Sequence, residues 1–279
     1  VIDDTVGVHA SRYKSLAFFL AGRLNLSSIE EALSDVYNQN KTIKLRCMRG
    51  TLHIATLKNA AIYHSASLSQ RMKTCSYLRN RIGVTDSTFM YVRDYICEAL
   101  LNGSRTIKDL SAGISNKGKT YVSSLSIVVR TLWEEGVLCI QNSGISWEHE
   151  ERKYSLFSTQ YPSVDLNSTN IDTAEAKLIF SYFEVYGPAT ISDAAWWSGL
   201  TTENIKRILS GHKDEFMEVN IERWVEKYIL SVKDLEAIRE SRTFNSSIRF
   251  LTYEDNLLKA YKISRKRFVN PDKFKLVYN

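Results

Sequence analysis

His9 is the residue whose type and setting first suggest chemistry in this chain. It lies in the stretch IDDTVGVHASRYKSLAFFLAGR, between a Gly-Val and an Ala-Ser step and ahead of an apolar segment typical of a helix. Histidine changes its charge near neutral pH, so its ring can accept or donate a proton there. A second interpretation stays open, because a half-buried histidine can equally cap or pack the start of a helix.

Three polar residues near His9 could assist it. Asp3 and Asp4 precede it and could orient the ring or act as a base themselves, and Ser11 follows two positions later. Side chains at i and i+2 of a helix point away from each other. His9 and Ser11 can therefore act on one ligand only if the backbone between them is extended or turning.

Metal and cofactor chemistry finds little support in the sequence. The four cysteines, Cys47, Cys75, Cys97 and Cys139, stand far apart, and the five histidines are scattered. Neither set has the spacing of a zinc site, which predicts reduced thiols in a cytosolic protein without a metal. The chain also lacks a Gly-rich phosphate loop, a G-x-S-x-G elbow and a His-Glu-x-x-His helix, so we expect no cofactor.

Length and hydropathy predict a soluble protein with a sizeable core. The 279 residues are 44% hydrophobic, enough for about two domains. No window approaches the roughly 18 uninterrupted apolar residues of a membrane span, so we expect no membrane partner. The sequence begins at Val1 with no targeting leader, so we expect it to be trimmed at its start.

Positive charge is concentrated in two blocks of the chain. Segment 41–85 holds nine basic residues and no acidic one, and segment 249–279 holds eight basic and three acidic residues. The two blocks carry +14 against +6 for the whole chain, so the remainder carries −8. Massed like charges repel one another unless a counter-charged partner is bound. The pattern favours a polyanion-binding surface, although each block could also be an ordinary solvated surface.

An internal repeat supplies the architecture. NGSRTIKDLSAGIS (Asn102 to Ser115) aligns with YGPATISDAAWWSG (Tyr186 to Gly199) at an offset of 84 residues. Each segment follows a predicted helix and opens a short second helix, for which Thr106 or Thr190 is a plausible N-cap or first-turn residue. A third helix and two strand-like runs come next in each copy, and the third helix of the second copy is expected at about Thr202 to Ser210.

This order of elements, found twice, is the plan of the winged helix-turn-helix. The third helix of the first copy carries Lys119, Ser123 and Arg130 on a polar stripe opposite an apolar face, and its counterpart carries Lys206. These residues are candidate DNA contacts. The alternative is a repeat that serves as a scaffold for protein partners.

Three blocks of the sequence carry a family resemblance. CMRGTLHIATL (Cys47 to Leu57), YGPATISDAAWWSGL (Tyr186 to Leu200) and IRFLTYEDNLLKAYKISR (Ile248 to Arg265) stand in the order found in the AlkZ-like family. The chain therefore resembles this family of winged-helix DNA-binding proteins, which includes bacterial DNA glycosylases that remove bulky or crosslinked alkylated bases.

The resemblance implies an α+β, C-shaped fold of tandem winged helices with a C-terminal β-barrel-like domain. We accordingly expect a winged-helix-like domain with the basic block at 1–84, winged helices at 85–165 and 166–235, and a β-rich segment at 236–279. The last block ends early relative to the family, so we expect an incomplete barrel.

The resemblance also gives His9 a role. Family glycosylases carry Gln-x-Gln, or a variant with His first or Asp last, just ahead of the first helix, where this chain reads His9-Ala10-Ser11. Hydrolysis of an N-glycosidic bond passes through an oxocarbenium-like sugar and needs a positioned water. We expect His9, Ser11 and Asp4 to serve that water. Ser11 departs from the family pattern, and its shorter side chain puts that role in question.

Double-stranded DNA is the expected partner, with a monomeric protein in the cytoplasm near the nucleoid. The rival hypothesis is a non-catalytic winged-helix DNA-binding protein, a regulator or damage sensor on the same scaffold. Candidate DNA contacts outside the repeats flank a Gly50 turn in the first basic block or belong to the basic and aromatic mixture of the last: Lys44, Arg46, Arg49, His53, Arg249, Lys262 and Arg265.

Overall fold

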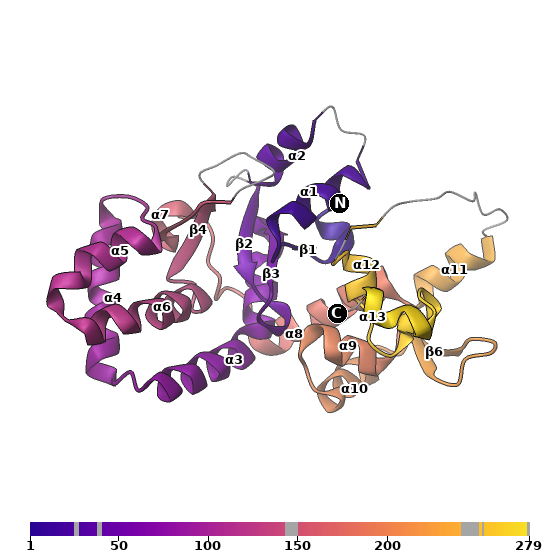
Figure 1. Cartoon of the computed structure of the whole chain (residues 1–279). Coiled ribbons are helices and arrows are strands. Elements are labelled where there is room, and N and C mark those ends of the chain that lie inside the picture. Colours follow the sequence, from indigo (N-terminus) through magenta and orange to yellow (C-terminus); the bar gives the residue numbers. More distant parts are fainter. Residues whose placement is uncertain (25–27, 38–40, 143–149, 241–250, 253, 278–279) are drawn as a thin grey trace.

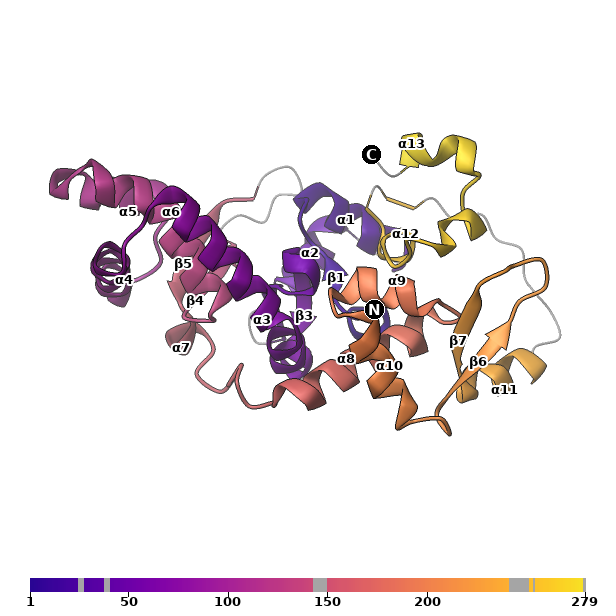
Figure 2. The same ribbon diagram turned by 90° about the horizontal axis from the view of Figure 1, so that it is seen from below.

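A computed structural model describes residues 1–24, 28–37, 41–142, 150–240, 251–252 and 254–277. A small antiparallel sheet from the N-terminal part of the chain stands in the middle of the molecule (Figure 1). The two repeat copies lie on opposite sides of it, as the view from below also shows (Figure 2).

The central sheet has the strand order β1-β3-β2, from β1 (Val8–His9), β2 (Thr42–Arg46) and β3 (Leu52–Thr56). In its register, His9 faces His53 across β1 and β3. The helices α1 (Tyr13–Ala21) and α2 (Ile29–Val36) pack an apolar cluster with the sheet. The short helix η1 (Asp3–Thr5) precedes β1, and η2 (Met48–Gly50) forms the turn between β2 and β3.

The long helix α3 (Leu57–Ile82) begins directly after β3 and packs along α8 (Ile171–Tyr186). Gly83 ends it in a left-handed conformation, with φ of 77° and its N–H bonded to the carbonyls of the last turn. Because α3 also contacts α6 (Lys119–Glu134), it joins the central sheet to both repeat copies.

The first copy consists of α4 (Asp86–Leu101), α5 (Ile107–Ile114), η3 (Ser115–Lys117), α6, and a hairpin of β4 (Leu138–Asn142) and β5 (Arg152–Leu156). The short α7 (Phe157–Gln160) follows the hairpin. The N-cap prediction is confirmed, since the Asp109 N–H donates to the Thr106 hydroxyl and the Asp109 carboxylate accepts from the Thr106 N–H.

The second copy repeats the order with α8, α9 (Ile191–Ser198), α10 (Thr202–Ser210) and a hairpin of β6 (Phe216–Asn220) and β7 (Lys227–Ser231). Thr190 and Asp193 form the same reciprocal cap, and the predicted bounds of α10 are confirmed. Trp197 is buried in the core, whereas its neighbour Trp196 is half-buried. The two copies therefore share their element order and their helix start signal.

The predicted C-terminal barrel is not found. The described residues after Ser231 hold no strand, and they form α11 (Val232–Glu240), α12 (Asn256–Lys259), η4 (Ser264–Arg267), η5 (Pro271–Lys273) and α13 (Phe274–Val277). Local capping explains the helical turns: the Asp255 carboxylate accepts from the Leu257 N–H, and Asn270 caps a turn that begins with Pro271. In place of the strands that the family resemblance implies, this segment buries Ala260 and Tyr261 in a cluster with residues of α8 and α9.

Candidate active site

His9 opens onto a cavity of about 130 Å³ built by four segments that are far apart in the sequence. They are the start of the chain, the turn between β2 and β3, helix α9, and the C-terminal segment around α12. The lining residues are His9, Ser11, Met48, Arg49, Thr51, His53, Trp197, Glu254, Asn256 and Lys259. The structure thus brings His9 and Ser11 together and adds a carboxylate and a lysine.

Asn256 fixes the backbone of His9. Its side-chain oxygen accepts from the His9 N–H at 2.9 Å, and its amide nitrogen donates to the Gly7 carbonyl at 2.6 Å. Gly7 itself has φ of 79°, and an added Cβ would lie 3.2 Å from the Ile54 carbonyl oxygen, so a glycine is needed there. The C-terminal segment therefore holds β1 in place.

The His9 ring lies between a hydroxyl and a carboxylate. Its Nε2 is 3.3 Å from the Ser11 Oγ, and its Nδ1 is 3.7 Å from Glu254 Oε2. Nδ1 and Oε2 are both buried, and neither has a hydrogen-bond partner within the described ranges. A proton on Nδ1 would face the carboxylate and leave Nε2 as the acceptor on the cavity side.

Burial lowers the pKa of His9 below its ordinary 6.5, and the charges of Lys259 and Arg49 lower it further, while Glu254 raises it. At neutral pH the ring is therefore uncharged and able to accept a proton. The neighbouring ring of His53 lies edge-on, with centroids 5.4 Å apart, and burial together with His9 lowers the pKa of His53 to about 3.

Glu254 is the residue that sequence reasoning missed. Its backbone has φ of 64°, and its carboxylate lies 3.3 Å from the Lys259 ammonium and 3.7 Å from Arg12 Nε. The next residue, Asp255, is fully buried and accepts two hydrogen bonds from Arg23, at 2.7 and 2.8 Å. The available signal was the acidic pair Glu254-Asp255 together with the Gly-Arg pair that ends the first helix.

Arg49 stands at the tip of the turn between β2 and β3. It has φ of 54° and Gly50 has φ of 70°, a tight turn that the glycine permits. The Arg49 guanidinium carbon is 3.8 Å from the ring centroid of Trp196, and Arg265 approaches the same ring at 4.9 Å. Trp196 therefore contacts two of the predicted DNA contacts, and one of them, Arg49, lines the cavity.

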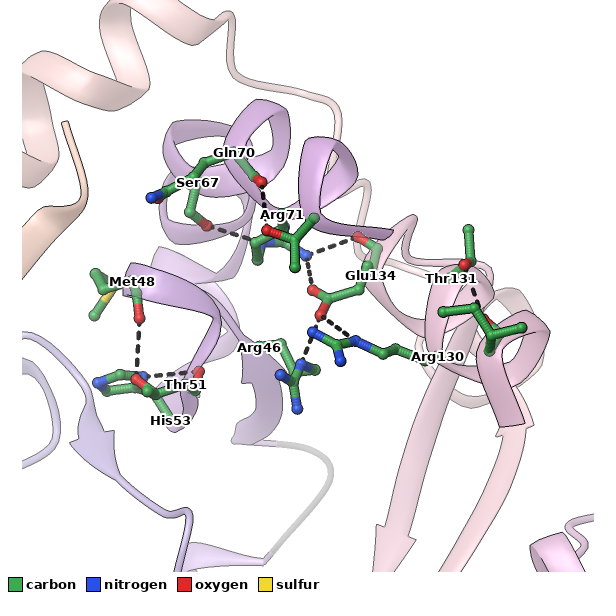
Figure 3. Close-up of polar contacts among 12 residues, drawn as sticks. Arg46, Met48, Thr51, His53, Ser67, Gln70, Arg71, Arg130, Thr131 and Glu134 are labelled. Atoms are coloured by element: carbon green, nitrogen blue, oxygen red, sulfur yellow. Dashed lines mark hydrogen bonds and ion pairs between the residues drawn. The ribbon is translucent and has the colours of Figure 1, made fainter. Parts of the chain in front are cut away.

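Other predicted contacts from the first basic block are placed differently. Lys44 is 4% exposed and forms an ion pair with Glu150, so its ammonium does not reach the protein surface. His53 is buried, and its lowered pKa leaves it uncharged. Arg46 donates to the buried Glu134 at 2.6 Å, in a cluster drawn in Figure 3. Counting charged residues along the sequence could not distinguish basic side chains that are buried from those that are exposed.

The remaining candidates lie outside the cavity around His9. Lys119 and Ser123 are exposed on α6, Lys206 is exposed on α10, and Lys262 is exposed beside α12. Arg249 lies outside the described residues. The Asp4 side chain is 82% exposed and pairs with the Val1 amino group, while Asp3 accepts from Thr56 and Asn59. Neither aspartate lines the cavity around His9.

The site has the order of groups that general-base catalysis requires: a carboxylate, a neutral imidazole and a hydroxyl beside an open cavity. Within the described part of the chain, no three His, Cys, Asp or Glu side chains are grouped as a metal site would need. In the same part, no helix is both long and apolar enough to cross a membrane.

Comparison with known proteins identifies a family. The model of the family described as DNA glycosylase AlkZ-like matches residues 2–279. Among solved structures, the chain is similar to the Streptomyces sahachiroi DNA glycosylase AlkZ, with 22% identity and a TM-score of 0.76. That match covers 100% of this chain and 76% of the other. No curated protein gave a significant match to the sequence.

Proposed function

Because the chain belongs to the DNA glycosylase AlkZ-like family, we propose that it hydrolyses the N-glycosidic bond of alkylated or bulky-adducted bases in double-stranded DNA. The observation that carries this proposal is the cavity in which a half-buried, neutral His9 stands between Glu254 and Ser11.

In the proposed mechanism, a water molecule beside His9 Nε2 attacks the anomeric carbon of the damaged nucleotide. The bond from that carbon to the base breaks, and the base leaves with the bonding electrons. The proton of the water passes to Nε2. A base alkylated at a ring nitrogen already carries a positive charge and leaves as a neutral molecule, so a single general base is sufficient.

Glu254 acts as a positioning residue in this mechanism. Its carboxylate, 3.7 Å from Nδ1, favours the tautomer with a proton on Nδ1 and stabilises the imidazolium that forms when Nε2 takes a proton. Ser11 shares the water with His9, because its hydroxyl already lies 3.3 Å from Nε2. Serine thus replaces the second glutamine of the family pattern at shorter reach.

The repeats supply the DNA-binding surface of the proposal. The element order of both copies supports the winged-helix interpretation, and exposed Lys119, Ser123, Lys206 and Lys262 supply donors for DNA contacts. Arg49, which lines the cavity, and Arg265 both contact the ring of Trp196 and add positive charge to this surface. We propose that one protein molecule binds one duplex, near the nucleoid of the cell.

A single-turnover base-release assay tests the function. Protein in excess over duplex DNA carrying 7-methylguanine should release the base, and His9→Ala should slow release by about 10²- to 10⁴-fold, the usual contribution of a general base. His212→Gln, at a half-buried histidine that pairs with Glu215 and does not line the cavity, is the matched control. If intact binding is accompanied by no release from any lesion, the rival hypothesis of a non-catalytic DNA reader holds instead.

A further inference from the structure

A second cavity of about 110 Å³ adjoins the catalytic one, and Arg49 lines both. It lies where the end of β2, helix α3 and the last turns of α6 meet. Its lining residues are Arg46, Arg49, Gly50, Gln70, Arg71, Thr74, Arg130 and Glu134. Nothing in the proposed reaction uses this cavity.

Three arginines surround a single carboxylate there (Figure 3). Glu134, which is 1% exposed, accepts from Arg71 and Arg46 at 2.6 Å each, and Arg130 Nε lies 3.8 Å from it. The cluster therefore carries a net charge of +2, and Arg49 at the rim adds another positive charge. Excess charge in a partly buried setting repels itself unless an anion is bound nearby.

The three arginines differ in how many of their donors are already used. Arg71 is satisfied inside the protein, donating to Glu134, Ser67 and the His64 carbonyl. Arg46 donates through Nε only, and Arg130 makes no hydrogen bond to the described residues, with its Nε buried. Two guanidinium groups thus keep free donors beside an open cavity, next to the amide of Gln70 and the hydroxyl of Thr74.

We propose that this second cavity binds one backbone phosphate of the DNA strand that carries the target nucleotide. A planar guanidinium matches the paired oxygens of a phosphodiester, and the guanidinium groups of Arg46 and Arg130 with the amide of Gln70 supply donors from several sides. The stripe of Lys119 and Ser123 on α6 leads to Arg130 at helical spacing, so bound DNA running along α6 reaches the cavity. The inference rests on the proposed action on DNA.

Arg130 is the residue to change, because Arg46 and Arg71 still neutralise Glu134 without it. Arg130→Gln should weaken binding of an undamaged duplex about tenfold. It should also flatten the slope of log K against log salt by about 0.9, the value for one lost phosphate contact. Arg130→Lys should leave this salt slope unchanged but lower the affinity for the duplex several-fold. Arg239→Gln, an exposed arginine on the remote α11, should change neither quantity.

A methylphosphonate scan locates the contact. The duplex carries a central tetrahydrofuran abasic analogue, and one phosphate at a time is replaced by a neutral methylphosphonate. At one position close to the analogue, the replacement should weaken duplex binding by the wild-type protein and leave duplex binding by Arg130→Gln unchanged. The proposal is overturned if no position couples to Arg130, if the slope of Arg130→Gln is unchanged, or if Arg239→Gln flattens it equally. It is also overturned if inorganic phosphate occupies the cavity while no methylphosphonate position couples, since the site would then hold a free anion.

These binding measurements do not require base release. A flattened slope in Arg130→Gln with no release from any lesion would support the phosphate site and reject the glycosylase. Release of 7-methylguanine by the wild type, together with an unchanged salt slope in Arg130→Gln, would support the glycosylase and reject the phosphate site.

Discussion

His9 and Glu254 are 245 positions apart in the chain, yet Nδ1 of the histidine lies 3.7 Å from Oε2 of the glutamate in one wall of the cavity around His9. The same wall carries Lys259, whose ammonium lies 3.3 Å from the other oxygen of Glu254. The glutamate therefore connects a proton acceptor to a fixed positive charge, and its replacement should affect the reaction in a defined way.

Glu254→Gln should reduce the single-turnover rate by roughly tenfold to a hundredfold, because the imidazolium formed in the reaction loses its counter-charge. The carboxylate raises the pKa of His9, so its loss should also move the pH profile toward lower pH. Rates measured from pH 5 to 8 check both effects, with Glu240→Gln on α11 as the control. An unshifted profile would mean that another group orients the ring.

The pH dependence of the wild type follows from the lowered pKa of His9. The neutral ring is the active form, so the rate should be flat between pH 7 and 8 and should fall as the pH drops through a value below 6.5. Spontaneous release from the damaged DNA is subtracted at each pH. A rate that still rises above pH 7 would point to a different base.

Ser11 distinguishes a shared water from a covalent nucleophile. If serine only helps to hold water, Ser11→Ala should slow release about tenfold, the order of one lost hydrogen bond. Ser11→Gln, which restores the family pattern, should retain or raise the rate. Loss of activity in both variants, as complete as in His9→Ala, would instead indicate attack by the serine oxygen. Single-turnover rates of the three variants decide the matter.

Asp193 should matter for stability far more than its counterpart Asp109. The buried Asp193 accepts from the backbone N–H groups of Lys262 and Ile263 at 2.7 and 2.6 Å, beyond its capping role, whereas Asp109 is exposed and only caps α5. Asp193→Asn should lower the free energy of unfolding by about 3 kcal/mol. Denaturant unfolding and limited proteolysis of the C-terminal segment measure the effect. Equal losses in Asp109→Asn would contradict this difference.

Local patterns predicted the parts of the fold that depend on local physics. The N-caps Thr106 and Thr190, the bounds of α10 and the order of elements in both repeats follow from helix start signals and apolar periodicity, and they are confirmed. The family was also identified from three short blocks, and the family model matches residues 2–279.

The parts that failed depend on contacts between distant segments. Lys44 is a basic residue in a strand, and only the fold shows that it is buried against Glu150. The C-terminal segment has mixed apolar and charged residues that fit strands or helical turns equally well. Its contacts with Asp193 and Arg23 decide in favour of turns. For the same reason, Glu254 could not be paired with His9 from sequence spacing.

The dependence of the cavity on residues 254–259 has a consequence for biosynthesis. The ribosome makes His9 and Ser11 first and Glu254, Asn256 and Lys259 only about 240 residues later, so a nascent or prematurely terminated chain lacks one wall of the catalytic cavity. It also lacks the amide of Asn256 that fixes the strand carrying His9. A chain that ends before Glu254 therefore cannot form the complete cavity, and under the proposed function it should release no base.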